Sequence, residues 1–381
     1  DPDSNVQFGE GGAGAFSDGK LNTQTNDVRN RDVLDAFVRF GAPEEVGYLG
    51  KPHVGSDNLK KVVANIRAYI QEHGGEFRFS EQLTDVRIRD GRLAEIVTTR
   101  GSEPCDELVL AVGHSARDTF EMLLSRGFVI EQKEFAVGVR MEHLQEKIGR
   151  AQYGAGYAAL PPADYKLVSH ASDRGVFTFC MCPGGVVIPA ASEEGGVVTN
   201  GMSDFARAGR NANSALVVQV FRSDFGSEHP LAGVQFQRKL ERAAFAAAGG
   251  GYRAPVQLVG DFLADKESYY FGEVRPTYAP GTAFVPMQAI FPRAVTDAMK
   301  AALPDMNARL SGIAAYESVL TGVESRTSSP VRIVRGPDLQ AAGIAGIYPC
   351  GEGCGYAGGI TSAAADGIRV AEALAEKYAE I

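Results

Sequence analysis

The stretch from Ala345 to Ile360 is the feature that most constrains what this chain can fold into. It holds a short apolar run, a turn dense in glycine with one acidic residue, Glu352, and then a helical pattern from Thr361 onward. This order predicts a strand, a loop and a helix. Glycine lets the main chain approach a ligand closely, and the free N–H groups of a helix start favour negative charge. The stretch therefore predicts a loop that contacts a flat, electron-rich ligand such as a flavin, with Glu352 accepting hydrogen bonds from ribityl hydroxyls.

Length and charge narrow the class of protein. The chain has 381 residues, enough for two domains with well-buried cores. Its formal net charge of −9 argues against a nucleic-acid-binding protein, and no apolar run approaches the roughly 18 residues of a membrane span. Five cysteines at irregular spacing and the lack of a visible secretory leader predict a cytoplasmic protein without a disulfide framework. The first residue is Asp1, which predicts that the natural polypeptide begins earlier.

Periodicity predicts an α/β fold with an interruption. In the first part, helices are predicted over residues 57–73 and 116–125, and strands over 76–79, 83–89, 93–99 and 107–113. A β-rich texture follows, with strands over 166–169, 175–182, 186–190, 197–200 and 215–221, one helix over 236–248 and long loops over 249–292. We interpret this as a Rossmann-like FAD/NAD(P)-binding domain, incomplete at its N-terminus, made of residues 1–131 and 321–381. An inserted β-rich α+β substrate domain would occupy residues 132–320.

Two stretches match the dinucleotide-binding pattern G-x-G-x-x-G. The first, residues 9–14, has neither the apolar strand before it nor the apolar helix after it that phosphate binding needs. The second, residues 353–358, has a predicted strand and helix in the right places, but too few residues follow it to supply a second strand. It is therefore not the ADP half-site of a complete βαβ unit, although it still fits a flavin-facing loop.

Seven stretches in order resemble a known family. They are residues 5–21, 110–120, 179–185, 200–203, 211–216, 324–330 and 351–360. Together they resemble FAD-dependent dehydrogenases of bacteria and plastids whose substrates are uncharacterised, related to the glutathione-reductase-type flavoproteins. In that family the G-x-G-x-x-G turn and its acidic strand precede the segment that begins here, which implies a truncated chain with a weakened site for the FAD pyrophosphate.

The resemblance implies a set of cofactor-binding residues. They are Gly11, Gly12, Ser17, Asp18, Lys20, Leu83, Gly113, Gly351, Glu352, Gly358, Gly359 and Ile360. Of these, Leu83 would place its backbone near adenine, and Gly113 would lie beneath the ADP moiety. Gly359 and Ile360 would offer N–H groups to the pyrimidine edge of the flavin. The alternative for Ser17, Asp18 and Lys20 is a solvated loop, and for Glu352 an exposed loop acid.

Four residues are candidates for catalysis: His114, Cys180, Cys182 and Arg326. His114 titrates near neutrality and suits acid–base chemistry, and Arg326 suits an anionic substrate. Cys180 and Cys182 share one side of an extended segment, where a thiol pair can exchange electrons or attack a substrate. The alternatives are a structural histidine, small buried hydrophobes in place of reactive thiols, and structural ion pairing. The cysteine spacing does not predict a metal site.

The leading interpretation is an FAD-dependent dehydrogenase that transfers hydride from a small organic substrate to flavin N5, with NAD(P)H as a possible transient electron donor. One alternative is a non-catalytic flavin- or nucleotide-binding protein, such as a redox sensor or an assembly partner. Another is a fragment that binds no cofactor. No nucleic-acid or membrane partner is expected.

Overall fold

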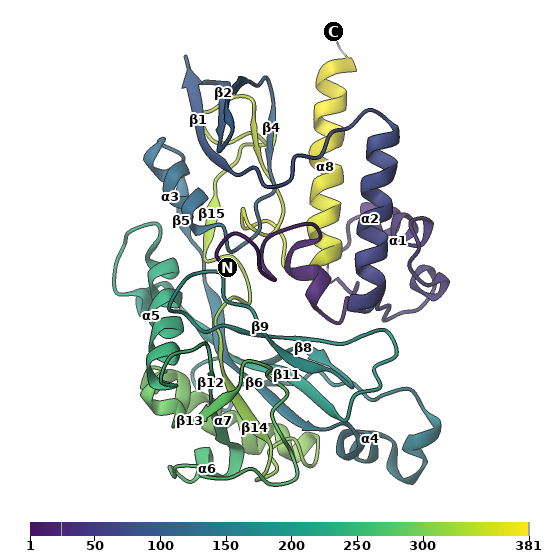
Figure 1. Cartoon of the computed structure of the whole chain (residues 1–381), viewed down its shortest axis with the longest axis vertical. Helices are drawn as coiled ribbons and strands as arrows, with labels where there is room; N and C mark the ends of the chain where they lie inside the picture. The colour runs from purple at the N-terminus through teal and green to yellow at the C-terminus, as the bar shows by residue number, and fades with distance from the viewer. Residues whose placement is uncertain (24, 380–381) are drawn as a thin grey trace.

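The computed structural model describes residues 1–23 and 25–379. The chain forms a mixed α/β fold, with a large seven-stranded sheet in its lower half and smaller sheets and helices above it (Figure 1). Both ends of the chain belong to the upper half, where the purple N-terminal segment lies beside the yellow C-terminal helix. No helix within the described residues is long and apolar enough to cross a lipid bilayer.

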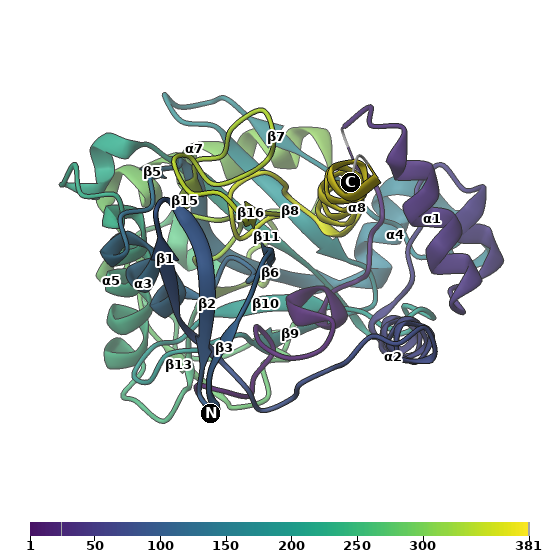
Figure 2. The same ribbon diagram turned by 90° about the horizontal axis from the view of Figure 1, so that it is seen from above.

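The upper half contains elements from both ends of the sequence. They are α1 (Arg29–Arg39), α2 (Ser56–Glu72), β1 (Leu83–Arg89), β2 (Arg92–Thr98), β3 (Gly101–Pro104), β4 (Leu108–Leu110), α3 (Arg117–Ser125), β5 (Ile130–Gln132), β15 (Val331–Ile333), β16 (Ile347–Pro349) and α8 (Ile360–Ala379). Seen from above, α1, α2 and α8 group on one side and β1, β2 and β3 on the other (Figure 2). The predicted helix over 57–73 is confirmed as α2, which buries Leu59 and Val62.

The predicted strands over 83–89 and 93–99 are confirmed as β1 and β2. Asp90 and Gly91 join β1 to β2 with φ values of 51° and 73°, which suits the two positive φ angles of a tight hairpin turn. The predicted strand over residues 76–79 is wrong. The three-stranded sheet has the order β1-β2-β3, so this segment has no neighbouring strand to complete its hydrogen bonds.

The lower half is built on the seven-stranded sheet, in the order β13-β12-β14-β6-β11-β8-β7. Its elements are β6 (Phe135–Leu144), α4 (Gln145–Tyr153), β7 (Val168–Ser169), β8 (Val176–Cys182), β9 (Val186–Pro189), β10 (Thr199–Met202), β11 (Asn211–Val220), α5 (Ala232–Ala247), β12 (Ala254–Leu258), α6 (Val259–Leu263), β13 (Thr282–Phe284), α7 (Arg293–Arg309) and β14 (Val319–Glu324). Strands β6 and β11 pair antiparallel along their whole ten-residue length.

The two faces of this sheet differ in what covers them. Helices α5 and α7 pack on one face and share its apolar core. The β9–β10 hairpin packs across β6, β11 and β14 on the other face, which carries buried polar residues, among them Arg140 and Asn213. Gly201 makes this approach possible, because a Cβ added there would lie 1.9 Å from the Arg140 guanidinium.

The expectation of long loops over 249–292 is partly wrong, because the segment contains β12 and α6. The spacing of apolar residues in the sequence also did not predict β6 or α7. Strand β6 is buried along nearly its whole length but includes Arg140, Glu142 and His143, so it lacks an apolar alternation. Helix α7 carries Pro304 in its interior, a residue that normally argues against a helix.

The two largest of the five hydrophobic cores among the described residues lie one in each half. One surrounds the large sheet, and the other surrounds β4, β5, β15 and β16. Leu231, the N-cap residue of α5, and Val234 within α5 belong to the second core, so the lower half contributes side chains to the upper half. The division at residues 131 and 321 therefore stays a prediction. So does the Rossmann-like assignment, since the upper half has a single parallel pair, β4 with β16, among its described residues.

Candidate functional site

The closing glycine loop follows the predicted order of strand, loop and helix. Strand β16 pairs in parallel with β4, and α8 begins at Ile360. The Cys350 N–H donates to the Leu110 carbonyl at 2.9 Å, which extends the pairing into the loop. A Cβ added at Gly353 would lie 2.3 Å from the Gly113 carbonyl oxygen, so the two backbones are in direct contact. Gly113, predicted to lie under the cofactor, is thus adjacent to the loop.

The start of α8 has main-chain donors available. Among the described residues, no acceptor is bonded to the N–H groups of Ile360 or Thr361. A Cβ added at Gly358 or Gly359 would meet no atom within 4 Å, so this part of the loop borders open space. Free N–H groups beside open space are what a helix start offers to an electron-rich ligand. Gly351 lies at the other end of the loop, with φ of 73°.

The N-terminal glycine segment lies against this helix start. Residues Gly12–Phe16 form a 3-10 turn with Gly11 at φ of 83°, and the described residues 1–8 form no strand, which confirms that this match to G-x-G-x-x-G is not a βαβ fingerprint. A Cβ added at Gly14 would lie 3.4 Å from the Ile360 side chain. The Thr361 hydroxyl donates to the Leu21 carbonyl at 2.7 Å. The structure therefore brings together the two glycine segments, which are more than 300 residues apart in sequence.

The three polar side chains predicted to contact the cofactor from this segment already have partners in the chain. The Ser17 hydroxyl donates to the Gly14 carbonyl at 2.7 Å and accepts from the Gly19 N–H. Asp18 is fully buried and is paired with Arg207. The Lys20 ammonium donates to the Met181 carbonyl. Asp18 and Lys20 thus attach the glycine segment to the lower half.

Glu352 lies in the loop as predicted, and it is partly buried. Burial raises its pKa to about 7, and the nearby Lys133 ammonium opposes that shift. Burial also lowers the pKa of Lys133. Lys133 lines a surface pocket of about 390 Å³. The other residues of this pocket are Glu131, Gln132, Glu134, Arg222 and Arg332.

Leu83 begins β1 and packs against the hydrophobic core that also contains Cys354 of the closing loop. Its contact with adenine stays a prediction.

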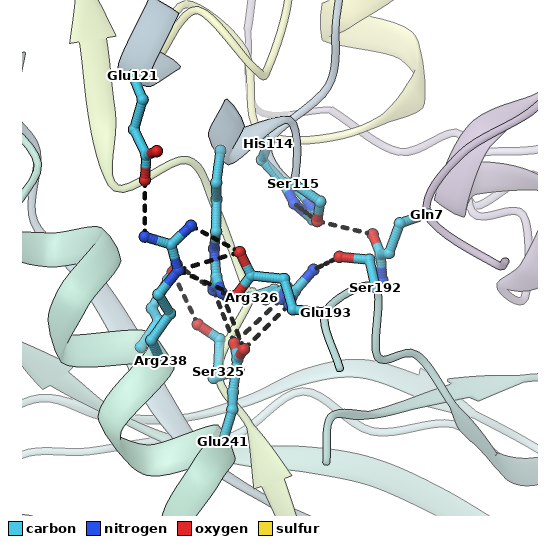
Figure 3. A network of polar contacts seen from close by, with 12 residues as sticks. Gln7, His114, Ser115, Glu121, Ser192, Glu193, Arg238, Glu241, Ser325 and Arg326 are labelled. Atoms are coloured by element: carbon cyan, nitrogen blue, oxygen red, sulfur yellow. Dashed lines mark hydrogen bonds and ion pairs between the residues drawn. The ribbon is translucent and has the colours of Figure 1, made fainter. Parts of the chain in front are cut away.

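A buried ion network joins the two halves beside His114 (Figure 3). Glu241 of α5 is 1% exposed and accepts hydrogen bonds of 2.7–3.1 Å from Arg117 of α3 and from Arg326, which follows β14. Burial alone would raise the pKa of Glu241, but the two guanidinium groups outweigh it and hold the pKa well below its usual range. The predicted substrate-binding group of Arg326 is therefore engaged, since it also donates to Ser192.

His114 lies at the edge of this network. Burial, together with the charges of Arg326 and Arg117, lowers its pKa to about 4, so the imidazole is neutral at pH 7. Its Nδ1 lies 3.1 Å from the Ser115 hydroxyl, which donates to Gln7 at 3.1 Å. His114 follows Gly113 directly, which places it near the closing loop.

The predicted cysteine pair lies at the end of β8, away from this network. The five cysteines of the chain are free thiols. Arg140 is fully buried, and its Nη2 donates to the Cys180 carbonyl at 2.8 Å and reaches the Cys182 sulfur at 3.5 Å. A hydrogen bond from the Cys182 thiol and the charges of Arg140 and Lys20 outweigh burial and lower the pKa of Cys180 to about 6. The same hydrogen bond and burial raise the pKa of Cys182.

Sequence reasoning did not identify Glu241, Lys133 or Glu324. Glu241 lies four residues after Gln237, next to the apolar side chains of α5. An acidic residue at such a buried position predicts a basic partner, because a buried charge has to be paired. Nothing local in the sequence marks Lys133 or Glu324, because their surroundings come from distant segments. Among the described residues, no cluster of His, Cys, Asp and Glu suits a metal ion.

Comparison with known proteins shows which family the chain belongs to. A family model described as "FAD-dependent protein, C-terminal domain-like" matches residues 134–327. A protein of Clostridium beijerinckii (strain ATCC 51743 / NCIMB 8052), described as an uncharacterized protein, is 50% identical over 380 residues, covering 99% of this chain and 71% of that protein.

Two solved structures show a weaker likeness. An oxidoreductase from Methanosarcina mazei has a TM-score of 0.38 and 10% identity, covering 97% of this chain and 68% of that one. Glycine oxidase from Bacillus cereus ATCC 14579 has a TM-score of 0.31 and 11% identity, covering 95% and 74%. Scores this low support no argument. The family model and the 50% identical relative show that the chain belongs to the family of FAD-dependent proteins that share this C-terminal domain.

Proposed function

We propose that the protein is an FAD-dependent oxidoreductase that transfers hydride between a small organic substrate and N5 of a flavin held at the closing glycine loop. Membership of an FAD-dependent family supports the cofactor. The observation that carries the proposal is the start of α8, where free N–H groups of Ile360 and Thr361 border open space beside the segment 9–21.

The donors at this site fit a flavin. When bound, the flavin supplies the acceptor for two electrons and a proton. The Ile360 N–H would stabilise negative charge on a ring edge, through the partial positive charge of the helix start. Glu352, with its pKa near 7, accepts hydrogen bonds from ribityl hydroxyls. The backbones of Gly351, Gly358 and Gly359 would let the ring come close, because they carry no side chains.

The other proposed cofactor residues lie on two sides of the closing glycine loop. Gly11, Gly12 and Ser17 form the turn that lies across from Ile360, while Gly113 and Leu83 lie on the β4 and β1 side. Asp18 and Lys20 fix the position of this turn through Arg207 and Met181 and leave ligand contact to the backbone.

Of the candidate catalytic groups, His114 suits the substrate side best. His114 is neutral at pH 7 and therefore offers a nitrogen lone pair to a substrate proton. Arg326 is bound by Glu241 and Ser192, so we assign it to positioning the loop around Ser325. NAD(P)H as a transient donor remains part of the proposal.

The experiment compares two glycine substitutions in the same loop. Gly358→Ala adds a methyl group where the chain leaves open space, so we expect unchanged stability and roughly ten-fold weaker flavin binding, about 1.4 kcal/mol. Gly353→Ala pushes a methyl group into the Gly113 carbonyl, so we expect an overpacking cost of about 1–3 kcal/mol in stability as well. FAD titration followed by flavin fluorescence and absorbance, with thermal unfolding in parallel, measures both.

Reduction by substrate is the second readout. FAD-loaded protein, mixed anaerobically with a panel of alcohols, amines, hydroxy acids and NAD(P)H, should lose its flavin absorbance with at least one donor. The proposal fails if the purified chain takes up no added FAD. It also fails if Gly358→Ala binds FAD as tightly as the wild type, because the flavin would then lie elsewhere.

A further inference from the structure

We propose that Cys180 and Cys182 form a nucleophilic thiolate site, in which Cys180 presents the reacting sulfur to small organic disulfides. This inference does not rest on the flavin chemistry proposed above, because the thiolate is created by the groups around β8.

The backbone at Cys180 is adapted to expose a side chain. Strands β8 and β11 pair Cys182 with Asn213 and Phe179 with Ala215, so Cys180 and Met181 together face the single residue between those two partners. This is a β-bulge, a feature that re-aims side chains and is frequent beside active sites. Cys180 has φ of 44°, a left-handed conformation that is uncommon for a residue with a side chain. As a result Cys180 is partly exposed while Cys182 is fully buried.

Two cations flank the pair from different segments. Arg140 of β6 is 0% exposed and contacts the Cys180 carbonyl and the Cys182 sulfur. Lys20 of the N-terminal glycine segment donates to the carbonyl of Met181, the residue between the two cysteines. Positive charge at this range favours the thiolate over the thiol.

Two anionic groups lie near these cations. Asp18 is paired with Arg207 and also lies 3.8 Å from the Lys20 ammonium, and Glu324 of β14 accepts from Arg140 at 3.2 Å. Burial raises the pKa of Glu324 to about 7, against the effect of Arg140. A protonated Glu324 leaves the charge of Arg140 available to a thiolate. The titratable and charged groups that face Cys180 are thus Cys182, Arg140, Glu324, Lys20 and Asp18.

The other cysteines provide an internal reference. Burial raises the pKa of Cys350 and of Cys354 to about 12. Cys105 is also partly exposed, and burial raises its pKa as well. The pair at β8 therefore differs from the other cysteines in its charge environment. Cys105 is the control thiol, because it is partly exposed like Cys180.

The reaction is thiol–disulfide exchange. The Cys180 thiolate attacks one sulfur of the disulfide, a new bond forms between these two sulfurs, and the original disulfide bond breaks. Cys180 is oxidised to a mixed disulfide, and the other half of the substrate leaves as a thiolate that takes a proton from water. Cys182 stays a thiol, and its S–H donates to the Cys180 carbonyl at 3.2 Å.

The test measures how fast each cysteine reacts with iodoacetamide between pH 5 and pH 9.5, with the modified peptides identified by mass spectrometry. Labelling of Cys180 should be half-maximal at about pH 6 and that of Cys105 above pH 9. At pH 7, Cys180 should react roughly five-fold faster, because its larger thiolate fraction outweighs the lower nucleophilicity of a low-pKa thiolate. Oxidised glutathione at pH 7 should add one glutathionyl group, at Cys180.

Variants separate a charge effect from a structural one. Lys20→Gln should move the Cys180 midpoint up by about half a pH unit or more, and Lys20→Arg should restore it. Cys182→Ala should also raise the midpoint, because the hydrogen-bond donor is lost. A Cys180 midpoint above pH 8, labelling of Cys105 in preference to Cys180, or a midpoint unaffected by Lys20→Gln would each overturn the proposal.

Discussion

Two buried arginine–glutamate clusters in this protein differ in how completely their polar atoms are paired. At the junction of the halves, Glu241 is bonded through both carboxylate oxygens to Arg117 and Arg326. On the polar face of the large sheet, Glu324 is bonded to Arg140 through one oxygen, and its other oxygen has no partner among the described residues. Both carboxylates are at least 95% buried, so burial alone does not distinguish them.

The difference shows in the charge that each glutamate carries. Two cations keep Glu241 ionised, and the pKa of Glu241 is lowered. One cation is too few for Glu324, whose pKa burial raises to about 7. A buried carboxylate needs paired charge and hydrogen bonds to remain ionised, so the first cluster suits a structural joint and the second a site with titratable groups.

The largest effect is expected from Glu241→Gln. This change leaves the buried Arg326 guanidinium without a counter-charge and leaves Arg117 with Glu193 alone, which should lower the free energy of unfolding by about 3–5 kcal/mol. Urea unfolding at pH 7 measures the loss. Glu121→Gln is the matched control, since Glu121 pairs with Arg238 at the surface, where a pair contributes about 1 kcal/mol or less. If Glu241→Gln and Glu121→Gln lowered stability equally, the Glu241 network would not be the contact that holds the two halves together.

Glu324→Gln should act in the opposite direction. The folded pKa of Glu324 is about 7 and the reference value is 4.5, so between these values the folded chain binds more protons at this group than the unfolded chain does. Stability from this group is therefore highest below pH 4.5 and falls by about 3 kcal/mol as the pH rises to 7. Glutamine does not titrate, so the variant should be about 2–3 kcal/mol more stable than the wild type at pH 8.

Unfolding of the wild type and Glu324→Gln at pH 5 and pH 8 checks this sign. The difference in free energy of unfolding between the two proteins should be small at pH 5 and larger at pH 8. If Glu324→Gln were the less stable protein at pH 8, the Arg140 cluster would be a second structural joint, and the contrast with Glu241 would disappear.

The smallest effects come from two hydroxyl groups, one in each cluster. The Ser325 hydroxyl donates to Glu241 at 2.7 Å, so Ser325→Ala should cost about 1–2 kcal/mol. The Thr321 hydroxyl lies opposite Arg140 in the sheet and has no partner among the described residues, so Thr321→Val should be neutral or slightly stabilising. Thermal unfolding of both variants is sufficient. A cost above about 1 kcal/mol for Thr321→Val would reveal a hydrogen-bond partner at the polar face.

Much of the upper half could be predicted from sequence because its signals are local. The apolar spacing of α2, the Asp90–Gly91 turn and the order strand–loop–helix at β16 and α8 each depend on neighbouring residues. The large sheet was harder to predict. Its central strand β6 buries Arg140 and Glu142, whose partners come from β11, β14 and the loop after α6, so no local pattern identifies it as a core strand.

The same distinction holds for the candidate site. The glycine spacing identified the loop around Glu352, and the short distance between Cys180 and Cys182 in sequence marked the pair. No local pattern indicated that Arg326 would be paired with Glu241, or that Lys20 would reach the cysteine pair. Those contacts join segments 85 and 161 residues apart.

By itself, the sequence determined where the backbone can bend and which short segments become helices or strands, because steric freedom at glycine and the side-chain period act over a few residues. The tertiary structure decided which charges are paired. Desolvation and Coulomb attraction depend on what is packed around a group, and in this chain they shift the pKa values of Glu241 and Glu324 in opposite directions and create the reactivity proposed for Cys180.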